Sequence, residues 1–341
     1  MRPNLILAAG GEGNNGPLAS TELYNPTINA WSPAGNLATA RGSFQMVRLP
    51  CGNVVVAGGI DDDHTLASAE IFNTITRTWS AAGHLTTARG FSQMVALSGG
   101  NVLTAGGVDS NDTALASAEL YNSNANVWSA AASMATARDS FQLLRLQDGD
   151  LLAAAGADNT RPSDSEELYN VTAATWSAAG RLQTAKVYFQ TVLLLSGKVL
   201  AAGGADINGS ELVSTDLYNP ITDSWSAVGS MAIARDCFQM VRLQSGCVLA
   251  AGGLNGDHVA LASAELYNPI TNTWSAAGSL AMARAFFQMV LLADGSVLAA
   301  GGLDSDDNPM ASSERYNPIS NLWSAASSMA TPRGTFQMVS L

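Results

Sequence analysis

The sequence predicts an all-β fold, a seven-bladed β-propeller of four-stranded antiparallel blades, and three observations support this prediction. All seven tryptophans recur at intervals of 48 or 49 residues along the 341-residue chain. Each interval contains four short stretches of strand-like alternation separated by turn residues. The end of the chain supplies a strand that its beginning lacks. Four-stranded units at a period near 50 are typical of propeller blades.

The repeat leaves no segment over for a second domain. An aromatic residue lies seven positions before each tryptophan and a basic residue ten positions after it. The tryptophans are Trp31, Trp79, Trp128, Trp176, Trp225, Trp274 and Trp323. We therefore expect one domain over 1–341, with blades over about 41–88, 89–137, 138–185, 186–234, 235–283 and 284–332, and a last blade formed by 333–341 together with 1–40.

The unit 284–332 illustrates the four strands expected in each blade. A Gly-containing turn joins the first two strands, and a turn with proline at its second position joins the last two. The only interval of variable length separates the second strand from the third, and insertions are tolerated in surface loops, so we expect a loop there. The strands predicted for this unit are Phe287–Leu292, Ser296–Ala300, Ser312–Tyr316 and Asn321–Ala325.

The two ends of the chain predict how the ring closes. Asn4–Gly11 begins with a second strand that has no first strand before it, and Arg333–Leu341 is a first strand without successors. Joined, the last nine residues and the first forty make one blade of 49 residues. Such closure hides strand edges that an open sheet would expose to another chain.

The repeat resembles the kelch repeat, which combines a hydrophobic run, a double glycine, a tyrosine and a tryptophan. The strings "GSVLAAGG", "SAELYNPITNTWS" and "MATAR" carry this resemblance over essentially the whole chain. Ala155-Gly156 replaces one double glycine and Phe72 replaces one tyrosine. Where many kelch repeats have a histidine in the first strand, this chain has phenylalanine, or Ser92 in one unit.

Residues present in all seven units are best explained by something that every blade needs. We interpret the tryptophans and tyrosines as blade-packing residues, and the seven glutamines from Gln45 to Gln337 as buried amides that satisfy backbone groups. Each basic residue has a carboxylate counterpart two positions before the aromatic residue, which predicts a repeated Arg–carboxylate contact within or between blades. The carboxylates are Glu22, Glu70, Glu119, Glu167, Asp216, Glu265 and Glu314.

A second interpretation places the bases at the mouth of the central channel, where they would bind anionic groups. They resemble the arginines that some kelch modules use for acidic peptides. Strand direction puts the variable loops on the same face as these bases, and the two positions after each base vary most. Neutral drift would also explain that variation. The ligand-binding candidates are Arg41, Arg89, Phe91, Arg138, Asp139, Lys186, Tyr188, Arg235, Asp236, Arg284, Phe286 and Arg333.

The sequence predicts no catalytic residues, no metal and no cofactor. His64 and His258 fall in loops of separate blades and His84 precedes another blade, so a copper centre like that of galactose oxidase, whose fold resembles this one, lacks its histidine pair. A D-x-[DN]-x-[DNST] pattern in four loops places oxygen atoms at alternate positions, which suits calcium, although Asx turns explain it equally well. It starts at Asp61, Asp109, Asp206 and Asp304, and the first instance continues through Asp63 and Thr65.

Composition and charge disfavour some classes of binding partner. Charged residues are 13% of the chain, and 28 acidic against 16 basic side chains give a net charge of −12, which disfavours nucleic acid and anionic membranes. Cys51, Cys237 and Cys247 are too few for a disulfide framework. The N-terminal apolar stretch is too short for a secretory signal, so we expect a cytoplasmic, reducing compartment if the chain is complete.

These observations lead to an expected function. We expect a monomeric, non-catalytic binding scaffold that recognises a protein or peptide at the loop face and the channel mouth. A carbohydrate-binding or sugar-modifying propeller is the alternative from another class, and Phe91, Tyr188 and Phe286 would matter most there. A third alternative is a designed or recently amplified propeller with no selected ligand.

Overall fold

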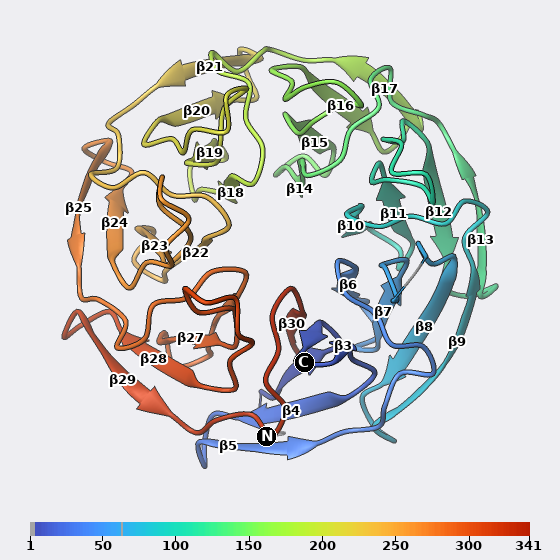
Figure 1. Cartoon of the computed structure of the whole chain (residues 1–341). Helices are drawn as coiled ribbons and strands as arrows, with labels where there is room; N and C mark the ends of the chain where they lie inside the picture. The colour runs from blue at the N-terminus through green and yellow to red at the C-terminus, as the bar shows by residue number, and fades with distance from the viewer. Residues whose placement is uncertain (1–3, 63) are drawn as a thin grey trace.

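Seven four-stranded antiparallel sheets are arranged in a ring around a central channel (Figure 1), which confirms the predicted fold class. A computed structural model describes residues 4–62 and 64–341. In six sheets the strand order follows the chain from the channel outwards, and in the seventh the C-terminal strand takes the innermost place; neighbouring innermost strands contact each other around the ring. The innermost strands are β6 (Gln45–Arg48), β10 (Gln93–Ala96), β14 (Gln142–Arg145), β18 (Gln190–Leu193), β22 (Gln239–Arg242), β26 (Gln288–Leu291) and β30 (Gln337–Ser340).

The second strand of each blade is its most deeply buried one. Every residue of these strands is buried, because each lies between two other strands and between two neighbouring blades, so the sequence reads as a continuous apolar run. The second strands are β1 (Ile6–Ala9), β7 (Val54–Ala57), β11 (Val102–Ala105), β15 (Leu151–Ala154), β19 (Val199–Ala202), β23 (Val248–Ala251) and β27 (Val297–Ala300).

The two outer strands of each blade carry the aromatic and tryptophan residues of the repeat opposite each other. The third strands are β4 (Thr21–Asn25), β8 (Ser68–Asn73), β12 (Ala118–Asn122), β16 (Glu166–Asn170), β20 (Thr215–Asn219), β24 (Ala264–Asn268) and β28 (Ser313–Asn317). The fourth strands are β5 (Ala30–Pro33), β9 (Thr78–His84), β13 (Val127–Ala131), β17 (Thr175–Ala178), β21 (Ser224–Ala227), β25 (Thr273–Ala277) and β29 (Leu322–Ala326). A two-stranded ribbon, β2 (Glu12–Gly13) and β3 (Gly16–Pro17), lies in one of the loops.

The chain ends meet in one blade, as predicted. Strand β30 pairs antiparallel with β1, from Ile6 opposite Ser340 to Ala9 opposite Gln337, and the sheet continues through β4 and β5. Figure 1 shows the red C-terminal strand beside the blue N-terminal strands. We number this sheet blade 1 and the following sheets, which begin with β6, β10, β14, β18, β22 and β26, blades 2 to 7. The ring is therefore closed by hydrogen bonds between the two ends of the chain.

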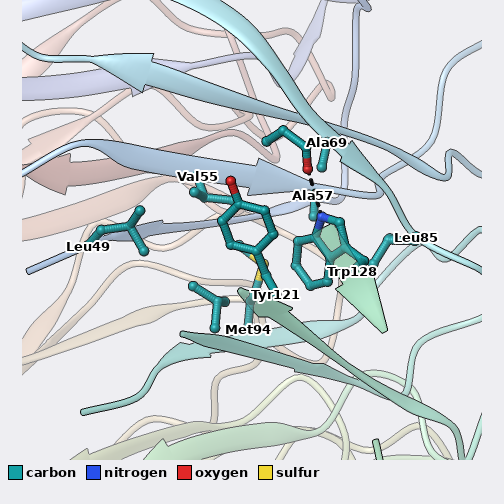
Figure 2. Close-up of a cluster of buried hydrophobic side chains, with 10 residues drawn as sticks. Leu49, Val55, Ala57, Ala69, Leu85, Met94, Tyr121 and Trp128 are labelled. Atoms are coloured by element: carbon teal, nitrogen blue, oxygen red, sulfur yellow. Dashed lines mark hydrogen bonds between the residues drawn. The ribbon is translucent and has the colours of Figure 1, made fainter. Parts of the chain in front are cut away.

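The cores lie between blades. In the cluster shown in Figure 2, Tyr121 and Trp128 of blade 3 pack against Leu49, Val55 and other buried residues of blade 2. The two rings lie at 5.0 Å between centroids, and the Trp128 indole donates a hydrogen bond to the backbone carbonyl of Ala82 at 2.9 Å. The same tilted aromatic–tryptophan pair recurs in all seven blades. This confirms the packing role predicted for these residues.

Strand direction separates two faces. The connections between second and third strands and those between blades lie on one side, which we call the loop face, and the tight hairpins lie on the other. Gly59 shows why the small residues recur: its φ is +101°, and an added Cβ would lie 2.7 Å from the Gly42 carbonyl oxygen. Ala155, which replaces the first glycine in blade 4, also adopts a left-handed φ of 51°.

One buried carboxyl departs from the repeat. In two blade interfaces a threonine hydroxyl, that of Thr21 or Thr215, accepts a hydrogen bond from the tryptophan indole of the next blade. Blade 4 has Glu166 at this position, 2% exposed and beside the Trp225 indole, and neither its two oxygens nor that indole makes a hydrogen bond of normal geometry. Burial raises the pKa of Glu166 well above its ordinary value.

We expect Glu166→Thr to stabilise the protein, and more so at pH 8 than at pH 5. The Glu166 carboxyl keeps its proton to higher pH in the folded state than in the unfolded state. The contribution of Glu166 to the free energy of unfolding therefore falls as the pH rises above 4.5, the ordinary pKa of a glutamate. Threonine has no ionisable carboxyl, so this pH-dependent loss of stability disappears, and its hydroxyl gains a hydrogen bond. Together the two effects should raise the free energy of unfolding by about 1–3 kcal/mol. Urea denaturation at both pH values measures this. Ala264→Ser, at the same position in blade 6, changes no charged group and should leave the pH dependence of stability unchanged. If the stability of Glu166→Thr depends on pH in the same way as that of the parent chain, the prediction is wrong.

Candidate ligand-binding site at the channel mouth

The seven bases of the repeat lie inside the blades. The Arg41 side chain is fully buried, and its Nη1 donates hydrogen bonds to the backbone carbonyls of Gly58 at 2.7 Å and Ser68 at 3.0 Å. Its Nη2 contacts Oε1 of Glu70 at 3.1 Å. Burial lowers the pKa of Arg41, and the Glu70 carboxylate opposes that shift. The guanidinium thus holds the second and third strands of its blade together.

The carboxylate of each pair has a further role. The two oxygens of Glu70 also accept hydrogen bonds from the backbone N–H groups of Ala38 and Thr39, at 2.8 and 3.2 Å, in the connection that leads into this blade. Six blades carry an Arg–Glu pair, and blade 5 carries Lys186 with Asp216 at 2.9 Å. Each of the six Arg–Glu pairs therefore fastens an incoming connection to its blade.

This geometry corrects the prediction that the bases bind a ligand at the mouth. Their side chains are 0% exposed and their charges are already paired, so we remove them from the ligand-binding candidates. The Arg–carboxylate contact that we also predicted is present within six blades, and a Lys–Asp contact replaces it in blade 5. The seven bases are Arg41, Arg89, Arg138, Lys186, Arg235, Arg284 and Arg333.

A pocket of about 200 Å³ opens at the channel mouth on the loop face, and we call it the mouth pocket. Its rim is formed by the second residue after each base. Phe91 and Tyr188 are 44% and 48% exposed, and Phe286 is half-buried. The seven rim residues are Ser43, Phe91, Ser140, Tyr188, Cys237, Phe286 and Thr335. The pocket therefore brings three of the predicted site residues together and adds four that were not among the candidates.

The rim backbone is held in an unusual conformation. All seven rim residues have a left-handed φ between 45° and 54°, which side chains with a Cβ rarely adopt and which a β-branched residue such as Thr335 adopts least easily. Backbone hydrogen bonds between neighbouring blades stabilise it, for example from the Phe286 N–H to the Cys237 carbonyl and from the Thr335 N–H to the Phe286 carbonyl, both at 3.0 Å. Strain of this kind is common at ligand-binding positions.

The first residue after each base is turned away from the pocket. In each blade it forms an antiparallel bridge on the loop face, as Asp139 does with Ala157 and Asp236 with Leu254. Asp139 is half-buried and Asp236 is only 7% exposed, with one carboxylate oxygen unpartnered. Burial, and then the nearby charge of Glu211, raise the pKa of Asp236 to about 6. These two predicted residues thus lie behind the rim and do not line the pocket.

The seven glutamines were interpreted wrongly as buried amides. They line the mouth pocket beneath the rim and are half-buried. Within the described residues, the one hydrogen bond made by these side chains is that from the Thr191 hydroxyl to Gln142 Oε1, at 3.5 Å. Because the innermost strand borders the channel, a polar residue there faces the pocket instead of the blade core. The glutamines are Gln45, Gln93, Gln142, Gln190, Gln239, Gln288 and Gln337.

The acidic loops use their carboxylates to cap their own backbone. Asp109 Oδ1 accepts hydrogen bonds from the N–H groups of Asn111 and Thr113, at 2.8 and 3.0 Å, and these bonds lower its pKa. The loops at Asp206 and Asp304 repeat the arrangement. Asp63, which belongs to the first instance of the pattern, lies outside the described residues. Asx turns therefore account for the pattern in these three loops.

The donor set at the mouth does not match a copper centre built on histidines. No histidine lines the mouth pocket, and the described residues contain no group of three His, Cys, Asp or Glu side chains placed to hold a metal ion. Burial raises the pKa of the Cys237 thiol, and the Asp236 charge adds to that rise, so the thiolate is disfavoured.

Comparison with known proteins agrees with this architecture. A model of the kelch motif matches residues 244–281 and 290–330, in blades 6 and 7. The chain is thus a seven-bladed β-propeller with kelch motifs. No curated protein matches it.

Solved structures share the fold. Matches extend to 782 chains. One is a fungal alcohol oxidase of the AA5 family in complex with copper, with a TM-score of 0.70 and 16% sequence identity, over 89% of this chain and 68% of the oxidase chain. At this identity the likeness concerns the fold alone. No part of the described chain forms a helix with the length and apolarity that crossing a bilayer requires.

Proposed function

We propose that this propeller is a non-catalytic binding scaffold that recognises a protein or peptide segment at the mouth pocket and the surrounding loops. The observation that carries the proposal is a break in symmetry: the blade framework repeats seven times, while the rim of the pocket alternates between aromatic and small polar side chains. A rigid scaffold that presents a varied rim and variable loops on one face is typical of a recognition surface.

The pocket chemistry supports a peptide as the occupant. Exposed aromatic rings at Phe91 and Tyr188 offer apolar contact area, and the glutamine amides below them can donate to and accept from a peptide backbone. Backbone hydrogen bonds between neighbouring blades hold the rim backbone in place before binding, which lowers the entropy cost of recognition.

Selection from a displayed random peptide library tests the proposal. We expect enriched peptides whose affinity falls by about tenfold or more in Tyr188→Ala and in Phe91→Ala, because each change removes a central aromatic contact. Ile221→Ala, an exposed position on the opposite face, is the matched control and should leave affinity unchanged. If no peptide is enriched, or if enriched peptides bind all three variants equally, the proposal fails. The substitutions Arg235→Ala and Arg284→Ala are unsuitable because they break buried ion pairs.

A carbohydrate is the second candidate ligand. The observation that favours it is the combination of exposed aromatic faces with amide groups in one small pocket, because sugars stack on aromatic rings and hydrogen-bond through their hydroxyls. A glycan array distinguishes the two. Glycan binding that is lost in Tyr188→Ala and Phe286→Ala, without peptide enrichment, would reverse our order of preference.

A further inference from the structure

The rim of the mouth pocket alternates in size around the ring. From blade 3 to blade 7 its residues are Phe91, Ser140, Tyr188, Cys237 and Phe286, so an aromatic side chain on every second blade is followed by a small one. The ring–ring contacts among the described residues are all aromatic–tryptophan pairs inside the blades. The three rim aromatics therefore do not stack on one another, and they surround a shared space.

Among the residues that the structure describes, no positively charged side chain lines this space. The rim and the glutamines below it are neutral, and all seven repeat bases are buried in ion pairs within their blades. The carboxylates of Asp139 and Asp236 lie close enough to Tyr188 to interact with it electrostatically: burial raises the Tyr188 pKa and these two charges add to the rise. The net charge of −12 on the whole chain adds a long-range attraction for cations and a long-range repulsion of anions.

The kind of cation follows from what the pocket lacks. No carboxylate lines it, since Asp236 is 7% exposed and turned behind the rim, so a strongly hydrated primary ammonium would lose water without gaining an ion pair. A methylated ammonium group is weakly hydrated and apolar at its surface, and aromatic faces attract its positive charge. Such a group suits a neutral, aromatic-rimmed space in a negative field.

We infer that the mouth pocket binds a methylated ammonium group, in contact with the rings of Phe91, Tyr188 and Phe286. This inference rests on the proposed function, because it names the chemical group by which that pocket recognises its ligand. The group can belong to a small quaternary ammonium compound or to a trimethyllysine side chain in a peptide, and the two sources share the same recognition chemistry.

Calorimetric titration of the full chain tests the inference with two matched pairs of probes. The first pair is choline and its neutral isostere 3,3-dimethylbutan-1-ol, and the second is a peptide with trimethyllysine and the same peptide with unmodified lysine. We expect the methylated cation to bind about tenfold or more tightly than its partner in at least one pair, since cation–π attraction to several desolvated rings supplies that difference. The pair that shows the preference identifies the source.

Substitutions at Tyr188 locate the site. Tyr188→Leu should weaken cation binding by about tenfold, because it keeps the apolar bulk and removes the aromatic face, whereas Tyr188→Phe should bind within about threefold of the parent chain. Ile221→Ala, at an exposed position on the opposite face, should leave the affinity unchanged. Thermal melting of each variant verifies that it folds.

Two outcomes would overturn the inference. One is equal binding of choline and its isostere together with equal binding of the two peptides, which would show that charge is not recognised. The other is an absence of cation binding while library peptides without a methylated ammonium group bind in a Tyr188-dependent way. In the second case a peptide-binding mouth pocket would stand, and in the first case the peptide library selection decides that question separately, so failure of the inference is distinguishable from failure of the proposed function.

Discussion

Replacing Arg138 by methionine is expected to lower the free energy of unfolding by about 3–5 kcal/mol, because it leaves a buried carboxylate without its counter-charge. The Arg138 side chain is 0% exposed, and its Nη2 lies 2.8 Å from Glu167 Oε1. Its Nη1 donates to the carbonyls of Ala155 and Ser165, both at 2.8 Å. Urea denaturation followed by tryptophan fluorescence measures the loss.

The same region of the chain offers a matched control. Arg181 forms an ion pair with Asp164 at 3.3 Å, but the two side chains are 70% and 43% exposed. Arg181→Met should therefore cost less than about 1 kcal/mol, as is usual for exposed pairs. A double variant, Arg138→Met with Glu167→Gln, should recover part of the loss because the unpaired charge is gone. Similar losses in Arg138→Met and Arg181→Met would show that burial of the first pair contributes little.

The sequence predicted the fold because repetition makes the constraints of one blade visible seven times. The invariant spacing of Trp128 from Tyr121 and Arg138 reflects a fixed strand pairing, in which Tyr121 lies opposite Trp128. The sequence also showed that the strand at Ile6 has no first strand before it and that an extra first strand lies at Gln337. In the structure these two strands, β1 and β30, pair with each other. Strand register and closure of the ring follow from the intervals between repeated residues, and a single sequence shows these intervals.

Burial was harder to predict than pairing. The matched sets of bases and carboxylates indicated a contact, but a side chain at the start of an innermost strand can point into the blade or into the channel, and the residue type fits both. Arg41 points inwards, while Gln45, four residues later, faces the pocket. Of the two variable residues that follow each base, the first forms a backbone bridge and lies behind the rim, as Asp236 does, while the second, such as Cys237, lies on the rim. Such orientations depend on backbone geometry that composition does not encode.

Deleting Arg333–Leu341 is expected to have the largest effect of all, because it removes two kinds of interaction from blade 1. Strand β30 is lost from the edge of β1, which exposes four buried residues and a row of unpaired backbone groups beside the channel. The deletion also removes Arg333, whose guanidinium contacts Glu22 at 3.1 Å and the Gly10 carbonyl at 2.7 Å. The loss should therefore exceed the cost of about 3–5 kcal/mol that breaking the ion pair alone produces.

Full-length Arg333→Met separates the two contributions. We expect it to remain a folded monomer of reduced stability, comparable with Arg138→Met, whereas the deletion should form aggregates through the exposed edge of β1. Size-exclusion chromatography with light scattering and thermal melting measure both. A synthetic peptide with the sequence of residues 333–341 should restore a monomeric state when added to the truncated chain, because it supplies the missing strand without a covalent link. A truncated chain as soluble and as stable as the full-length protein would contradict the closing role of the terminal strands.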